Sequence, residues 1–276
     1  MNTLKVILLL ASLSGLLMLA GYFVARGTGV VIALVLSALM NFGSYWYSDS
    51  IVLRMYSARE VPRAEAPALH NSVEALAAKA GLPKPRIYVV SNDVPNAFAT
   101  GRNEDHAAVA VTSGIQKILD RDELEGVLAH ELSHIKHKDI LISTMAATVA
   151  SAVVLLSRWA VFFGNDEGGG MIPAIAMAVI APVAATVIQM AISRSREYDA
   201  DAGSARITGK PEALASALRK LSEASRANPM NVNPSTAHMF IVNPLSGDFL
   251  RTLFSTHPPI EKRIERLLAM KAAQKA

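Results

Sequence analysis

The sequence predicts a mainly α-helical protein with a small β element, held in a membrane by four helices. Four stretches of about 20 residues carry few or no charges, the length that an α-helix needs to cross a bilayer core. They cover residues 4–24, 29–47, 140–163 and 171–192. The mean hydropathy of +0.31 is high for a soluble enzyme and agrees with this division.

The first two stretches predict a membrane hairpin over residues 1–48. A signal peptide is the alternative for residues 4–24, but its apolar core spans only about 7 to 15 residues. A second hairpin is predicted over residues 140–193. Its Ala-rich helices could instead be buried in a soluble core, although small residues also suit close helix contact in lipid.

The basic residues predict the orientation, because short loops rich in Lys and Arg stay in the cytoplasm. All the basic flanks of the two hairpins fall on one side: Arg54, Arg59, Arg63, Lys136, Lys138, Arg194 and Arg196. The polar parts, residues 49–139 and 194–276, are therefore expected to form one cytoplasmic body. We expect a lipid bilayer as partner and no nucleic acid, since the net charge of +4 gathers at span edges.

The absence of cysteine excludes disulfides, thiolate metal ligands and a Cys nucleophile. Any metal must therefore be held by nitrogen and oxygen. Four helices of the polar body are predicted over residues 66–80, 197–207, 211–226 and 258–271. Residues 86–91 and 107–112 are predicted as strands, 96–103 as a turn-rich segment and 228–255 as a long loop.

A further helix carries the chemistry. Asp120 lies three residues before Glu123, which predicts a capped helix start. On the helix that follows, His130 and His134 project from one face about one turn apart and can hold one ion. Glu131 lies beside them, close enough to accept a proton from an attacking water without being a ligand.

Zinc fits this pattern, since catalytic zinc sites use three nitrogen or oxygen ligands and keep a fourth position open. We expect one Zn²⁺ per chain. His137 is rejected as the third ligand, because seven residues of helix rise about 10 Å. The hairpin over 140–193 starts just after His134 and ends just before Glu197, which makes Glu197 the expected third ligand.

Asp201 lies four residues after Glu197 and is expected to accept a hydrogen bond from a ligating imidazole. The alternative is that Glu197 and Asp201 only pair with Arg194, Arg196 or Arg206 on a solvated helix.

Three segments together resemble the HtpX family of membrane zinc endopeptidases: His-Glu-Leu-Ser-His at 130–134, the acidic run 197–201 after a hairpin, and Asn-Ala-Phe-Ala at 96–99. The resemblance covers nearly the whole chain. It implies a zincin-like metallopeptidase of the bacterial inner membrane, multi-pass, with its active site facing the cytoplasm. It also implies a stress-response role in cutting misfolded or unfolded membrane proteins, and kinship with CAAX prenyl proteases.

Two further residues are candidates for the cleft. Asn96 is expected to hold the substrate backbone by strand addition, or else to be a turn residue after Pro95. His257 is expected to stabilise the developing oxyanion, or else to pack at a helix start before Pro258.

Other functions stay open on the sequence. A CAAX-type or intramembrane-type metalloprotease is one alternative, although the charged residues 120–125 place the motif at the interface rather than inside a span. A catalytically inactive metal-binding chaperone or a metal transporter is another. Glu131 discriminates between them, because hydrolysis needs it and metal binding does not. The sequence specifies neither the substrates nor the oligomeric state.

Overall fold

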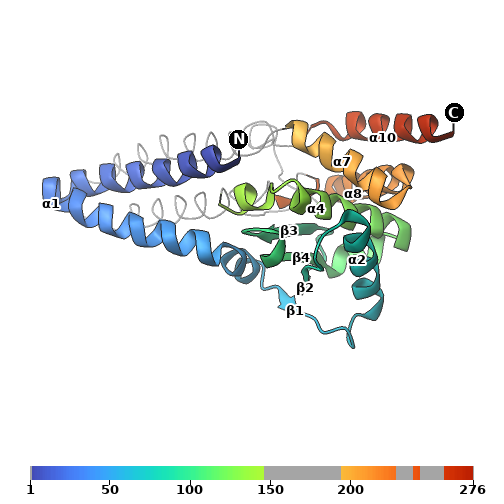
Figure 1. The fold of residues 1–276 in the computed structure, drawn as a ribbon, viewed down its shortest axis with the longest axis horizontal. Helices are drawn as coiled ribbons and strands as arrows, with labels where there is room; N and C mark the ends of the chain where they lie inside the picture. Colours follow the sequence, from blue (N-terminus) through green and yellow to red (C-terminus); the bar gives the residue numbers. More distant parts are fainter. Residues whose placement is uncertain (1, 146–193, 228–238, 243–257, 276) are drawn as a thin grey trace.

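The computed structural model describes residues 2–145, 194–227, 239–242 and 258–275. A long helical arm projects from one end of a body in which helices pack on a small sheet (Figure 1). The predicted fold class, mainly helical with a small β element, is confirmed.

Helix α1 (Asn2–Met55) forms the arm and folds back on itself (Figure 1). The chain turns near Arg26, whose φ of 52° lies in the left-handed region. The two halves of the arm contact each other, since the Asn41 side-chain amide donates to Ser14 Oγ at 2.9 Å. The predicted N-terminal hairpin therefore has its counterpart in α1.

Among the described residues, Arg26–Tyr47 is long and apolar enough to cross a membrane, and Leu10–Leu19 is a shorter apolar helix. The described part of the chain therefore offers one candidate span where the sequence predicts four. The expected spans over 140–163 and 171–192 lie almost entirely outside the described residues. The four-span arrangement stays a prediction.

A four-stranded sheet with the order β1-β2-β4-β3 forms the centre of the body. The strands are β1 (Arg59–Glu60), β2 (Arg86–Val90), β3 (Ala97–Gly101) and β4 (Ala107–Thr112). β2 and β4 run parallel, and the other two pairs are antiparallel.

Strand β3 corrects the prediction of a turn-rich segment over 96–103. All five of its residues are buried. A strand covered on both faces lacks the alternation of apolar and polar residues by which a half-exposed strand is recognised.

The sheet lies between two apolar layers. One face packs on a core that helices α2 (Pro67–Ala80) and α4 (Arg121–Lys136) share with α8 (Pro211–Ala227). The other face packs on Val52 and Leu53 at the end of α1. The short elements η1 (Glu104–His106) and α3 (Ser113–Ile118) flank β4.

Helix α4 begins with the predicted capping box. Asp120 Oδ1 accepts a hydrogen bond from Glu123 N, and Glu123 Oε2 accepts one from Asp120 N, both at 2.9 Å. The helix ends at Lys136, with His137 as its C-cap. Helix α7 (Arg194–Thr208) packs along α4, and α10 (Ile260–Lys275) packs on α8 and α7. Helix α7 therefore contacts both α4 and α10.

Candidate metal centre

The two histidines of α4 face the same point. His130 is buried and His134 is partly buried, and their Nε2 atoms lie 3.2 Å apart with the rings at right angles. This is the arrangement that a spacing of four residues on one helix face predicts.

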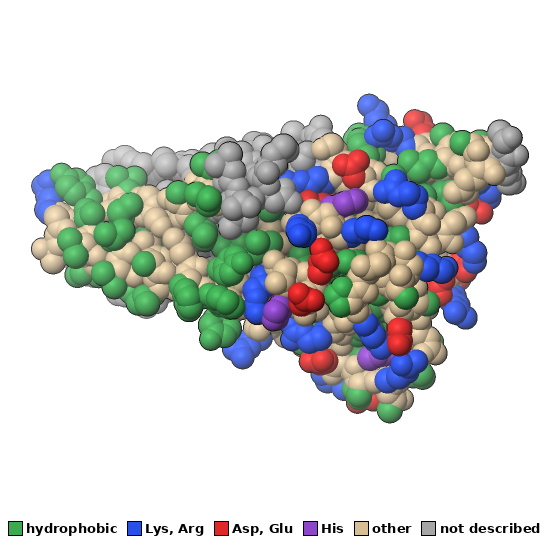
Figure 2. Space-filling model, in the orientation of Figure 1, with side chains coloured by type: hydrophobic (Ala, Val, Ile, Leu, Met, Phe, Trp, Pro, Cys, Tyr) green, Lys and Arg blue, Asp and Glu red, His purple; other side chains and the backbone are tan. Residues whose placement is uncertain are grey.

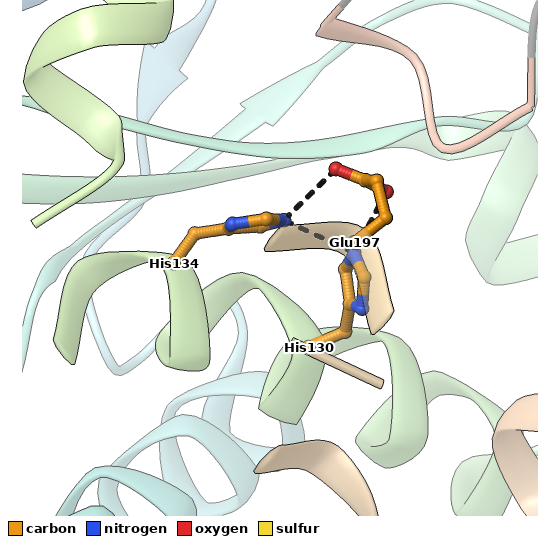
Figure 3. Close-up of side chains that lie close together, drawn as sticks. All are labelled: His130, His134 and Glu197. Atoms are coloured by element: carbon orange, nitrogen blue, oxygen red, sulfur yellow. Dashed lines mark hydrogen bonds and ion pairs between the residues drawn. The ribbon is translucent and has the colours of Figure 1, made fainter. Parts of the chain in front are cut away.

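Helix α7 brings Glu197 to this pair, as Figure 3 shows. Its Oε1 lies 3.4 Å from His134 Nε2, and its Oε2 lies 3.7 Å from His130 Nε2. One ligand atom from each of the three residues lies within 4.8 Å of the other two. The structure therefore brings together the three predicted ligands, which come from parts of the sequence more than 60 residues apart.

The geometry of the donor atoms fits one tetrahedral ion. Zinc binds imidazole nitrogen at about 2.0 to 2.1 Å, so two ligand atoms of a tetrahedral site lie about 3.3 Å apart. The two Nε2 atoms are separated by 3.2 Å. Two nitrogens and a carboxylate are also a donor set that catalytic zinc uses.

Glu131 lines the same pocket as these three residues, but it is hydrogen-bonded to the sheet. Its Oε2 accepts a hydrogen bond from the backbone nitrogen of Ala99 in β3 at 2.8 Å. Burial raises the pKa of this carboxyl, and the neighbouring histidines oppose the rise. A carboxylate with a raised pKa is suited to accept a proton near neutral pH.

Comparison with known proteins decides the family. The model of the protein family described as "Peptidase family M48" matches residues 63–271. The chain belongs to this family.

The relatives of this M48 peptidase agree. It is 58% identical to a "Protease HtpX homolog" of Pyrococcus furiosus over 268 residues, which are 94% of this chain and 93% of the relative. It is 55% identical to the HtpX homologue of Aquifex aeolicus over 277 residues, covering 95% and 92%. The predicted resemblance to the HtpX family and the prediction of a metallopeptidase are confirmed.

A solved structure shares the fold. The crystal structure of Ste24p from S. mikatae matches with a TM-score of 0.54 at 18% identity, over 92% of this chain and 62% of that one. At this identity the likeness concerns the fold alone.

Asp201 lies behind His130 in this M48 peptidase. Its Oδ1 is 3.0 Å from His130 Nδ1, although the direction of this contact leaves Nδ1 without a well-aligned hydrogen bond. Burial raises the Asp201 pKa, but the adjacent Arg263 lowers it by more, so that the pKa falls to about 2. Asp201 is therefore a carboxylate placed beside His130 Nδ1. The hydrogen bond that the sequence predicts between them stays a prediction.

Arg263 of α10 is a residue of the candidate site that sequence reasoning missed. Its side chain is fully buried and donates twice to Asp201, from Nε to Oδ2 at 2.8 Å and from Nη2 to Oδ1 at 2.7 Å. Its Nη1 lies 3.4 Å from Glu197 Oε2, and its Nη2 lies 3.5 Å from His130 Nε2. One guanidinium thus touches two candidate ligands and the residue behind one of them.

His134 has a carboxylate of its own. Its Nδ1 lies 3.4 Å from Asp139 Oδ2, and the other oxygen of Asp139 pairs with Arg196 Nη1 at 3.1 Å. Burial lowers the His134 pKa, but hydrogen bonds to Asp139 and Glu197 raise it more, to about 10. Each histidine therefore faces the ligand cluster with Nε2 and a carboxylate with Nδ1.

The other predicted residues lie elsewhere. Asn96 is buried and pairs with the backbone of this chain, donating to Met239 O at 3.3 Å and accepting from Ile241 N at 3.2 Å. Its role in binding a substrate stays a prediction. His137 is exposed at the end of α4 and is not part of the cluster, and His257 lies outside the described residues.

An open pocket of about 50 Å³ borders the cluster. One water molecule needs about 10 to 15 Å³, so the pocket has room for water beside the cluster. Its wall combines β3 with the segment that Asn96 holds. Besides the cluster and Glu131, the lining residues are Phe98, Ala99, Ile140, Ser143, Met239, Phe240 and Ile241.

Proposed function

We propose that this M48 peptidase is a zinc-dependent endopeptidase, with one Zn²⁺ per chain, that cuts misfolded or damaged membrane proteins. One observation carries the proposal: His130, His134 and Glu197 converge, while Glu131 stands beside them on a separate hydrogen bond to Ala99. Ligands and base are different residues, which is the division that hydrolysis requires.

The residues of the site then have distinct tasks. His130, His134 and Glu197 would hold the ion, which would supply a nucleophile at neutral pH and polarise the scissile carbonyl. Glu131 accepts the proton of the attacking water and passes it to the leaving amine. Asp201 and Asp139 hold the two imidazole rings so that each Nε2 faces the ion.

The substrate backbone would lie along β3. This strand is last in the order β1-β2-β4-β3, so one of its edges faces no other described strand. Peptide segments bind to such edges through main-chain hydrogen bonds. Ala99, whose backbone nitrogen holds Glu131, lies at the middle of that strand.

We place the peptidase in the cell inner membrane as a multi-pass protein, with residues 1–48 and 140–193 as hairpins and its active site facing the cytoplasm. The candidate span Arg26–Tyr47 and the basic residues that follow it support this arrangement. Residues 49–139 and 194–276 would form one catalytic body, a proposal supported by the packing of α4 on α7.

Purified protein in detergent tests the function with an unfolded membrane protein as substrate. Glu131→Gln should retain about one zinc per chain and lose cleavage by more than about 100-fold. Glu125→Gln, on the same helix but hydrogen-bonded to Ser72 and Arg121, is the matched control and should cleave normally. A chelator should abolish wild-type cleavage, and added zinc should restore it.

Two outcomes would reject the proposal. Cleavage by Glu131→Gln at the wild-type rate would remove the assigned base. A zinc-loaded wild type that binds unfolded protein without cutting it would favour the inactive chaperone instead.

A further inference from the structure

Aromatic side chains gather where helix α1 leaves its apolar span. Four of them form what we call the aromatic collar: Phe42, Tyr45, Trp46 and Tyr47, with exposed fractions of 63%, 36%, 44% and 62%. Figure 2 shows hydrophobic side chains along the arm and charged ones over the body. Trp and Tyr at the end of a span prefer the level of the lipid headgroups.

The body begins directly after the collar. Asp49, two residues beyond Tyr47, is buried and accepts a hydrogen bond from Arg86 of β2 at 2.5 Å. Val52 and Leu53 then pack on the sheet, and the Tyr56 ring lies 4.8 Å from that of Phe98 in β3. The span and the catalytic sheet are therefore joined without a linker.

The turn after β3 returns to the collar. The guanidinium of Arg102 lies 4.8 Å from the centre of the Trp46 ring, and its Nη1 donates to the Trp46 carbonyl at 3.3 Å. An arginine stacked on an aromatic ring at this level is suited to bind phosphate oxygens. The end of β3 therefore lies within the reach of one arginine side chain from Trp46.

This contact places the catalytic base relative to the lipid. Arg102 lies three positions after Ala99, just beyond the end of β3, and three steps of about 3.3 Å make about 10 Å. The backbone nitrogen of Ala99 holds Glu131. The polar layer of one leaflet is about 5 to 8 Å thick, so the base would stand close outside it.

We propose that the aromatic collar and Arg102 dock on the phospholipid headgroup layer and hold Glu131 within about 10 Å of the lipid surface. The peptidase would then select peptide bonds that lie a few residues from a substrate's membrane span, since about three extended residues cover that distance. This inference rests on the proposed function and names the part of the substrate that is cut.

The depth of the collar is tested first. The chain has two tryptophans, so Trp159→Phe leaves Trp46 as the only one. In phosphatidylcholine vesicles, lipids brominated near the headgroup should quench Trp46 fluorescence more than lipids brominated near the chain ends. No quenching by either lipid, or stronger quenching by the deeper bromines, would overturn the docking surface.

The selection of bonds is tested with peptides that carry a membrane span, a rigid proline-rich spacer and one cleavable sequence. A spacer of about 3 residues should allow cleavage in vesicles, and one of about 10, near 30 Å, should reduce it at least tenfold. Equal cleavage at both lengths would overturn the inference. Free peptides without the span separate the two proposals, because failure to cut them counts against the peptidase function itself.

Arg102 is tested by reversing its charge. Arg102→Glu should lower cleavage of the short-spacer peptide in vesicles severalfold and leave cleavage of the free peptide unchanged. Arg121→Glu is the matched control, since Arg121 is exposed at the start of α4 and pairs only with Glu125 among the contacts that the structure gives it. Wild-type behaviour of Arg102→Glu on both peptides would remove Arg102 from the docking surface.

Discussion

Gly203 of α7 lies directly against Ser133 of α4, where the two helices cross. A Cβ atom at position 203 would overlap Oγ and Cβ of Ser133. Ser133 is buried, and its hydroxyl donates to Ala129 O at 2.9 Å. The absence of a side chain at 203 therefore allows α7 to approach closely enough for Glu197 to reach both histidines.

Gly203→Ala should separate the helices and weaken the site. We expect a loss of about 1 to 3 kcal/mol in stability from overpacking, larger than the gain of about 0.5 to 1 kcal/mol from replacing a helical glycine. Zinc affinity should fall with it. Thermal unfolding measures the stability, and competition with a zinc chelator measures the affinity. The double variant Gly203→Ala/Ser133→Gly should recover much of the lost stability and zinc affinity. Unchanged zinc affinity would show that the crossing does not set the ligand geometry.

Arg263→Met should lower zinc affinity by about 10- to 100-fold, the range for residues that orient metal ligands. The buried Asp201 would lose the partner that holds it against His130, and an unpaired buried charge is costly. Arg263→Lys should retain part of the affinity. Adding Asp201→Asn to Arg263→Met should cost less than the sum of the two single changes. Additive losses would mean that the two residues act separately.

The pH dependence of zinc binding follows from His134. In the metal-free site its pKa is raised to about 10, so it carries a proton at neutral pH that zinc must displace. Below that pKa, zinc affinity should therefore increase about tenfold for each unit by which the pH is raised. Chelator competition across this range measures the slope, and calorimetry in two buffers with different ionisation enthalpies measures the proton released. An affinity that stays flat with pH would contradict a protonated His134.

Glu197→Ala should lower zinc affinity by more than about 100-fold, beyond the effect of residues that only orient a ligand. His137→Ala should bind zinc as the wild type does, because His137 is exposed at the end of α4, outside the cluster. Metal analysis of the two dialysed proteins gives the comparison. Zinc loss in His137→Ala alone would reverse the assignment.

Local patterns carried most of what the sequence predicted correctly. The spacing of His130 and His134 and the capping pair Asp120 and Glu123 each depend on contacts within one helix, so four or five residues suffice to recognise them. Glu197 needed one further step, the inference that a hairpin returns the chain to its starting side.

What the sequence did not predict depends on packing between distant segments. Arg263 lies among Ile260, Ile264 and Leu267 on the buried stripe of α10, and a cation at such a position was the available signal. Its partners come from α4, α7 and the backbone of Ile241, and cannot be read from its neighbours in the sequence. Asn96 likewise pairs with backbone 143 and 145 residues away.

The unbroken passage of α1 from its apolar span to Val52 has a mechanical consequence. A helix that tilts to match a thinner or thicker bilayer turns everything rigidly fixed to it through the same angle. With Arg26–Tyr47 crossing the bilayer as we propose, bilayer thickness would set the angle at which the cleft meets an incoming chain. Lipid composition would then be a variable of the reaction rate, alongside the substrate and the metal.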